Sequence, residues 1–184
     1  MLILKHFLIF SALGIVGGLG FIYSGVYPIG ADDHHTKLGH WALETLRERS
    51  IARSIKGITV PALDQPDMLL AGGTDYNQMC AECHLRPGKT ASDLSTYLYP
   101  QPPNLSLKSN DDTDPNKSAA RQFWYIKHGI KASGMPAWGV THDDARIWNM
   151  VAFLQKMPSL TPEQYQILTA PNDFDLQAND HDGM

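Results

Sequence analysis

The chain has 184 residues, 43% of them hydrophobic, and a formal net charge of −4. This length supplies one compact domain of about 100 residues with flanking segments rather than two full domains. The acidic excess lies in residues 159–184, and no cluster of Lys and Arg is present to neutralise phosphates, which excludes a nucleic-acid partner.

Residues 7–26 contain no charged residue and are long enough, at about 30 Å as a helix, to cross a bilayer. We predict an uncleaved membrane anchor over residues 1–30; a cleaved signal is the alternative, although Ile29–Ala31 is a mediocre cleavage site. Lys5 precedes the span and acidic residues follow it, so the remainder of the chain should be exported. Gly14 and Gly18 have the spacing of a helix-packing pair, and ordinary glycine content explains them equally well.

Residues 31–70 are predicted to be an amphipathic helix, over 34–56, followed by a proline-containing connector. The apolar residues of this helix recur at helical spacing: Leu38, Trp41, Leu46, Ile51 and Ile55. A domain boundary is expected near residues 57–70. Three histidines, His34, His35 and His40, could hold copper or zinc, but a solvated helix start is the simpler interpretation.

Residues 71–158 have a globular pattern. A short helix should lead through Tyr76 into Cys80, and helices are expected over 118–128 and from Asp143 to Met157. Thr141 and Asp144 resemble a capping box at the start of the last helix. The stretch through Asp114 is expected to be irregular, with a solvated surface turn at Asp111, Asp112 and Asp114, and residues 129–139 are expected to form a Gly-rich turn. No strand alternation appears, so the predicted class is all-α with long loops.

Residues 159–184 are predicted to be an acidic tail. Within it, one short turn is expected around Thr161–Leu168.

The pentapeptide Cys80-Ala81-Glu82-Cys83-His84 has the spacing of a covalent c-type haem site. On a helical turn both sulfurs face one side, so they can reach the two vinyl groups of one porphyrin while His84 binds the iron. A thioredoxin-like site would need a βαβ context, and a zinc site would need further ligands at matching spacing; the sequence offers neither. We therefore predict a single covalently bound haem c with its iron.

Met135 is the predicted second axial ligand. It lies in Ser133-Gly134-Met135-Pro136-Ala137-Trp138, where Gly and Pro favour a non-helical loop, and Trp138 could form a wall of the haem pocket. The other methionines and His128 fit less well, because Met150 and Met157 read as packing residues on a helix and Met79 adjoins Cys80.

Residues 71–158 resemble a class I cytochrome c domain, as found in single-haem bacterial cytochromes and in the cytochrome subunits of cbb-type oxidases. The resemblance rests on CAECHLRPG, the loop from Tyr99 to Asn104, FWYIKHGIKASGMPAW and DDARIWNMVAFLQKMP. It implies that the Pro87 carbonyl orients the His84 imidazole, and that the helix of Tyr76 crosses the last helix near Ile147 and Val151.

The resulting hypothesis is an electron carrier rather than an enzyme, since two axial ligands leave the iron no open position. It would be a single-pass protein of the inner, cytoplasmic membrane with its haem domain facing the periplasm. Its partners would be redox proteins, namely a quinol-oxidising complex and a terminal oxidase or reductase. The alternatives are a permanent electron-transfer subunit of a larger oxidase or dehydrogenase, and a peroxidase-like site with a labile Met135.

Overall fold

The computed structural model describes residues 2–108 and 114–170, and all regular structure in these ranges is helical, as predicted. The chain divides into two compact units, residues 1–35 and 36–184. The predicted boundary near residues 57–70 does not coincide with this division. Most of the predicted acidic tail, together with Asp111 and Asp112, lies outside the described residues.

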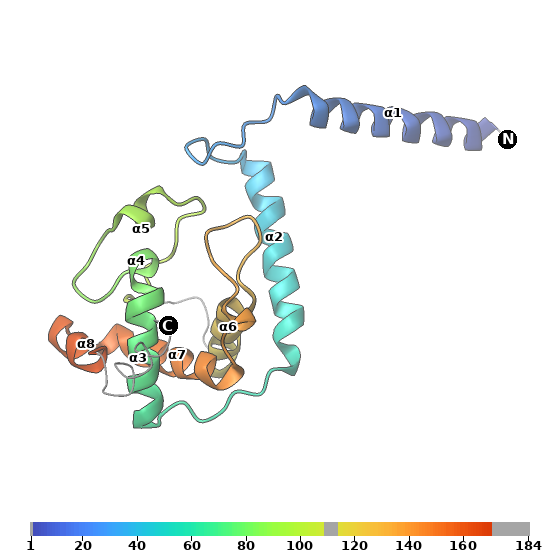
Figure 1. Cartoon of the computed structure of the whole chain (residues 1–184). Coiled ribbons are helices and arrows are strands. Elements are labelled where there is room, and N and C mark those ends of the chain that lie inside the picture. The colour runs from blue at the N-terminus through green and yellow to red at the C-terminus, as the bar shows by residue number, and fades with distance from the viewer. Residues whose placement is uncertain (1, 109–113, 171–184) are drawn as a thin grey trace, which may run out of the picture. The chain divides into compact units, whose positions relative to one another are not determined.

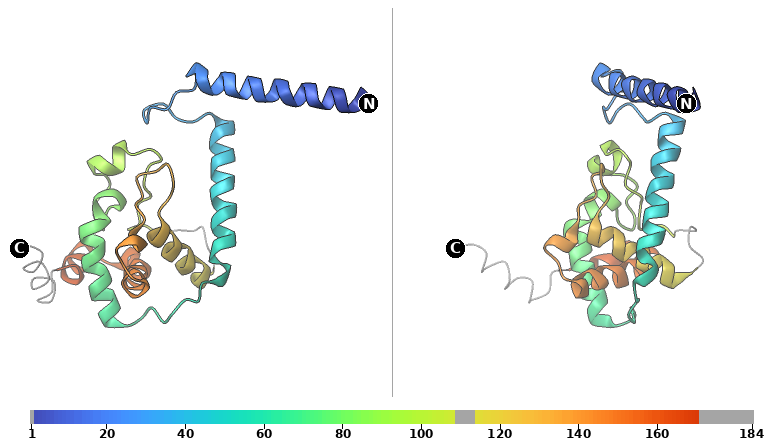
Figure 2. Two further views of the ribbon diagram at one scale, coloured as in Figure 1. Left: turned by 45° about the vertical axis from the view of Figure 1, so that its right-hand side comes forward. Right: turned by 90° about the vertical axis from the view of Figure 1, so that its right-hand side faces the viewer.

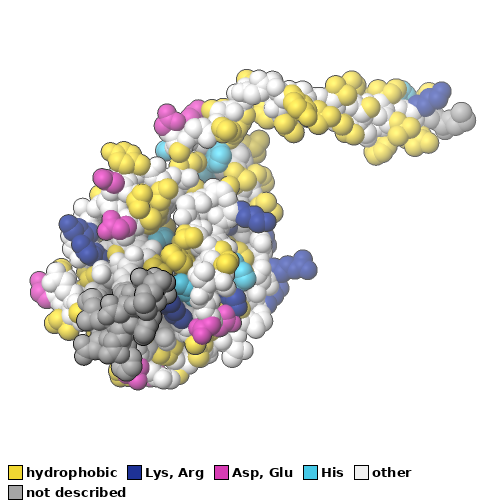
Figure 3. All heavy atoms as spheres, viewed as in Figure 1, with side chains coloured by type: hydrophobic (Ala, Val, Ile, Leu, Met, Phe, Trp, Pro, Cys, Tyr) yellow, Lys and Arg dark blue, Asp and Glu magenta, His cyan; other side chains and the backbone are white. Residues whose placement is uncertain are grey.

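The first unit is built on α1 (Leu2–Ser24). Its helix is long and apolar enough to cross a membrane, and none of its side chains is buried. Hydrophobic side chains cover it along its length (Figure 3). After the helix, the hydroxyl of Tyr27 lies 2.8 Å from Nδ1 of His35.

The second unit begins with α2 (Lys37–Ser54), which Thr36 caps by accepting a hydrogen bond from the amide of Gly39. The helix is shorter than the predicted 34–56. Only its C-terminal end is buried: Ile51 and, in the following turn η1 (Ile55–Gly57), Ile55 pack on Ala120. The predicted apolar face is therefore split, because Leu38, Trp41 and Leu46 are all exposed.

The core of the second unit is the crossing of α3 (Pro66–Met79) with α7 (Asp144–Lys156), visible in Figure 1. A Cβ on Gly72 would lie 1.9 Å from the carbonyl oxygen of Asn149, so only glycine lets the two backbones come this close. Both Ile147 and Val151 are fully buried in this core. The expected crossing of the Tyr76 helix with the last helix is confirmed.

Two further helices complete the core. The first, α6 (Pro115–His128), contacts α7 (Figure 2). It begins with Asp114 as its N-cap and buries Phe123 and Ile126. The second, α8 (Pro162–Leu168), is capped by Thr161 and buries Tyr165 against α3. The turn predicted at Thr161–Leu168 is thus a helix that belongs to the core, although it falls within the predicted tail.

The predicted cap of α7 and the predicted start of α3 are wrong. The cap of α7 is Asp143, whose carboxylate accepts from the amide of Arg146, whereas Thr141 lies at the end of the turn η2 (Trp138–Val140). Helix α3 begins at Pro66, five residues before the predicted start of the globular region, because proline suits the first turn of a helix, where its missing N–H is not needed.

Candidate haem site

Cys80 and Cys83 lie at the junction of α3 and α4 (Ala81–His84). The amides of Cys83 and His84 donate to the carbonyl oxygen of Cys80, at 3.1 and 2.8 Å, and this makes one helical turn of the pentapeptide. Both cysteines are free thiols. Burial raises the pKa of the Cys80 thiol to about 12, with a further contribution from the Asp75 carboxylate, and burial also raises the pKa of Cys83. Both sulfurs are therefore protonated at neutral pH before any reaction.

The imidazole of His84 has one nitrogen engaged. Its Nδ1 lies 2.9 Å from the carbonyl oxygen of Pro103. Because a carbonyl only accepts hydrogen bonds, Nδ1 carries the proton and Nε2 has a free lone pair. Burial lowers the pKa of His84, although the hydrogen bond to Pro103 acts in the opposite direction. The side chain is thus a neutral imidazole with the tautomer that a metal ligand needs.

The prediction that Pro87 orients this imidazole is wrong, because the carbonyl belongs to Pro103. Leu85, directly after His84, is the C-cap of α4 and has a φ of +63°, in the left-handed region. The chain returns to His84 twenty-one residues later, where the amide of Leu105 donates to the His84 carbonyl oxygen at 3.0 Å. This backbone contact places Pro103 beside the ring.

Tyr76 holds the left-handed turn. Its hydroxyl donates to the carbonyl oxygen of Leu85 at 2.6 Å and lies 3.3 Å from that of His84. The tyrosine is 1% exposed, and its ring packs on Phe153 of α7. The position of the His84 loop is therefore tied to the helix crossing in the core.

Met135 lies in a loop closed by its own hydrogen bonds. The amide of Ile130 donates to the Met135 carbonyl oxygen at 3.3 Å, and the amide of Met135 donates to Oγ of Ser133 at 3.1 Å. Gly129 ends α6 with a φ of +62°, and a Cβ there would lie 2.7 Å from the Met135 carbonyl oxygen. The loop needs glycine at this position both for the backbone conformation and for space.

The structure brings three of the six predicted site residues onto one core. Cys80, Met135 and Trp138 are partly buried and pack against the same hydrophobic cluster, together with Leu105. With Cys83 and His84 on the same helical turn as Cys80, the site offers two thiols, an imidazole nitrogen and a thioether, and such a donor set fits a haem c group. Met135 as the second ligand nevertheless stays a prediction.

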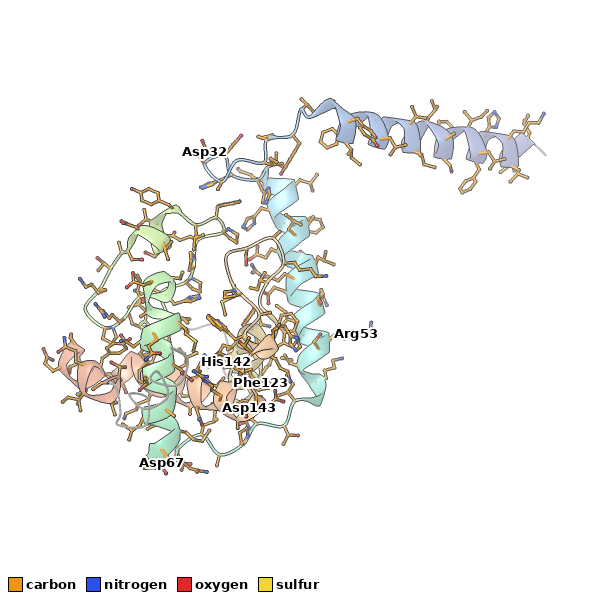
Figure 4. All side chains as sticks on the ribbon, viewed as in Figure 1. Asp32, Arg53, Asp67, Phe123, His142 and Asp143 are labelled. Atoms are coloured by element: carbon orange, nitrogen blue, oxygen red, sulfur yellow. The ribbon has the colours of Figure 1, made fainter. Side chains whose placement is uncertain are left out.

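Sequence reasoning missed three contributors. Pro103 and Leu105 fix His84 from nineteen and twenty-one residues downstream, and only the fold shows that their loop returns to the histidine. His142, which carries no motif, places its Nε2 3.3 Å from the sulfur of Met79 and its ring 5.4 Å from the Trp138 ring. Figure 4 labels His142 close to Phe123 and Asp143, in the part of the domain where α6 and α7 meet.

An open cavity of about 740 Å³ lies away from the pentapeptide. Its walls come from residues 54–59, α6 and α7 and include a stacked pair, Phe123 and Trp148, with ring centroids 4.2 Å apart. His128 lines this cavity, which does not include Cys80, His84 or Met135.

The other candidate ligands receive no support. Within residues 2–108 and 114–170, no group of three or more His, Cys, Asp or Glu side chains could hold a metal ion, so the copper or zinc interpretation of His34, His35 and His40 is unsupported. His40 lies 3.5 Å from the Glu44 carboxylate.

Comparison with protein families gives one match. Residues 67–154 match the family model described as cytochrome c oxidase, cbb3-type, subunit III. This segment begins at the second residue of α3, ends near the C-terminus of α7 and contains the pentapeptide and the Met135 loop. Comparison with curated proteins and with solved structures found no match.

Proposed function

Because residues 67–154 form a class I c-type cytochrome domain, we propose that the chain transfers single electrons through one covalently bound haem c held by Cys80, Cys83, His84 and Met135. The observation that carries the proposal is the hydrogen bond of His84 Nδ1 to Pro103, which leaves Nε2 free on the turn that also bears both thiols. When bound, a haem iron with imidazole and thioether ligands cycles between Fe(II) and Fe(III).

The residues of the chain have separate roles in this proposal. Cys80 and Cys83 attach the porphyrin, and His84 is held by Pro103 in one tautomer and one orientation, which raises its basicity as a ligand. Met135 is presented by a loop that its own hydrogen bonds stiffen. Trp138 and Leu105 would shield a bound haem from water, because both pack on the same core as Cys80. A haem held through both His84 and Met135 would have no position left for a substrate, so the domain would carry electrons rather than bind a substrate.

The proposed location is the periplasmic side of the inner membrane, with α1 as a single-pass anchor. The length and apolar composition of α1 support the membrane anchor. The lysine before the uncharged stretch and the acidic residues after it support the orientation. Electrons would arrive from a quinol-oxidising complex and leave to a terminal oxidase or reductase.

A second candidate is a permanent electron-transfer subunit of a membrane oxidase, favoured by the oxidase-subunit description of the matching family. Extraction in mild detergent separates the two, since a free carrier should purify alone and a subunit should bring stoichiometric partners.

The direct test is mass spectrometry of mature protein made in a host with haem-attachment machinery. We expect the mass of the chain plus one haem, no thiol reactive towards alkylating agents, and no carbon monoxide binding by the reduced protein. Unmodified thiols would overturn the haem proposal. Rapid carbon monoxide binding would instead favour the peroxidase-like alternative.

A further inference from the structure

Helix α2 has two different faces. One face docks on the haem domain: Ile51 is 1% exposed and packs on Ala120, and Glu48 forms an ion pair with Arg121 of α6. At about 100° per residue, Leu46 lies nearly opposite these contacts and Leu38 lies to one side of them, whereas Trp41 lies within about 20° of Glu48. The helix is therefore covered on one side only, and mostly at its C-terminal end.

The uncovered side carries a regular apolar stripe. Residues 41, 42, 45 and 46 follow residue 38 at spacings of +3, +4, +7 and +8, and this spacing places all five on one face of the helix. Leu38, Trp41 and Leu46 are 73%, 61% and 68% exposed. We call this set the outer stripe: Leu38, Trp41, Ala42, Thr45 and Leu46.

Charge is divided between the two sides of α2. Arg49 continues the outer stripe at +11, and Arg53 lies one turn further; Figure 4 shows Arg53 pointing away from the rest of the unit. The acidic residues lie toward the docked side, where Glu44 pairs with His40 and Arg47, and Glu48 with Arg47 and Arg121. The outer side thus combines two leucines and two arginines with no carboxylate, and Trp41 lies at its edge next to Glu48.

The connection to α1 keeps this stripe near the membrane. Only residues 25–36 separate the two helices, and a chain of that length spans at most about 45 Å. Asp32 and Asp33 lie in this connection and precede the stripe. If α1 crosses the bilayer, the start of α2 cannot leave the neighbourhood of the surface.

We propose that the outer stripe of α2 lies in the headgroup region of the membrane that α1 spans, with Trp41 at the interface and Arg49 and Arg53 against anionic lipid. A helix with apolar and aromatic residues on one face and arginines beside them has the chemistry of an interfacial helix. The docked face, with Ile51 and Glu48, is then turned from the lipid, so α2 acts as a rigid support for the haem domain. This inference rests on the membrane anchoring in the proposed function.

The test places a nitroxide label on the mature holoprotein in nanodiscs, one set zwitterionic and one containing anionic lipid. Thr45→Cys puts the label within the outer stripe, and Gln166→Cys, at an exposed position of α8, is the matched control. We expect the label at 45 to lose access to a water-soluble nickel chelate and gain access to oxygen, most strongly with anionic lipid. The label at 166 should stay open to nickel in both. Adding Arg49→Gln and Arg53→Gln should remove the difference between the two lipids.

Three outcomes would overturn the proposal. If the nickel chelate reaches the labels at positions 45 and 166 equally in both lipids, then the outer stripe is exposed to water. Shielding of position 45 only in native membranes, together with a co-purifying protein, assigns the stripe to a partner subunit. If the protein elutes separately from the nanodiscs, then neither α1 nor the outer stripe binds the membrane. The visible spectrum of the same sample shows independently whether the haem is bound.

Discussion

The hydroxyl of Tyr76 donates a 2.6 Å hydrogen bond to the carbonyl oxygen of Leu85, the residue that follows the histidine of the haem site. Tyr76 comes from the helix crossing in the core, and its ring lies against Phe153 and Tyr165. Leu85 has the left-handed backbone that redirects the chain after His84. One buried hydroxyl therefore connects the core packing to the geometry of the proposed ligand.

Replacing Tyr76 with Phe removes this hydroxyl and keeps the ring. The buried carbonyl oxygen of Leu85 then loses its donor, so we expect the free energy of unfolding to fall by about 1–3 kcal/mol. The freedom gained by the His84 loop should also shift the reduction potential. Guanidinium denaturation and a redox titration measure the two effects.

Tyr165→Phe is the matched control for this change. Its hydroxyl donates to the side chain of Asn77 at 3.0 Å, away from the histidine loop, while its ring touches Tyr76. A small loss of stability with an unchanged potential is expected. If both variants shifted the potential equally, Tyr76 would have no specific role in positioning His84.

Gly72→Ala should destabilise the crossing of α3 and α7. Alanine gains about 1 kcal/mol in helix propensity, but its Cβ would lie 1.9 Å from a carbonyl oxygen, and separating two packed backbones costs about 3 kcal/mol. The steric cost therefore exceeds the gain, and both stability and haem content should fall. Gly57→Ala is the control, because no atom lies within 4 Å of the added methyl group, and its denaturation midpoint should not drop.

The ion pair of Asp75 with Arg146 also joins α3 to α7. Nε and an Nη of the arginine lie 2.8 and 2.7 Å from the two carboxylate oxygens, and the aspartate side chain is only 11% exposed. Arg146→Met leaves a nearly buried carboxylate without these donors, so a loss of about 1.5–3 kcal/mol is expected. In a double-mutant cycle, adding Asp75→Asn should recover part of this loss; strictly additive losses would mean that the pair has no coupling energy.

Docking of α2 should weaken in acid through Glu48. Burial raises the pKa of this carboxyl, but the hydrogen bonds and charges of Arg121 and Arg47 outweigh burial, so its pKa is lowered in the folded protein. A lowered folded pKa means that the stabilisation is complete above the ordinary pKa near 4.5 and is lost as the pH falls through the folded value. The effect should stay below about 1 kcal/mol, because the carboxylate is partly exposed and screened by solvent.

The measurement is the unfolding free energy from neutral pH down to pH values below the ordinary glutamate range. Glu48→Gln should flatten part of the acid limb in this profile. A variant with an unchanged acid limb would show that the docking of α2 does not depend on this charge.

The sequence predicted the elements whose information is local. Helical spacing located the last helix and its seam of Ile147 and Val151, and the pentapeptide located both thiols and His84, because these patterns depend on neighbours in the chain. The cap of α7 was misplaced by two residues, since Thr141 and Asp143 both have suitable side chains and only the backbone path selects one.

Contacts between residues that are far apart in the sequence could not be predicted from the spacing of residues. Pro103 is far from His84 in sequence and reaches it through a left-handed Leu85, which no residue preference indicates, since leucine rarely adopts positive φ. The division of the apolar residues of α2 into an exposed set and a buried set has a similar cause. Its apolar residues fit one helix pattern, but α6 covers only the end near Ile51.

Met135→Ala should remove the proposed thioether ligand and leave its loop in place. The bonds that close the loop use the amide and carbonyl of residue 135 and the hydroxyl of Ser133, and none uses the sulfur. We therefore expect loss of the sulfur-to-iron charge-transfer band and a lower reduction potential, with the domain still folded. Met150→Leu is the control: it changes a fully buried methionine of α7 to a residue of similar volume, so the band should stay. A band that survives in Met135→Ala and disappears in another methionine variant would move the ligand to that residue, and the Met135 loop would then serve only to cover the site.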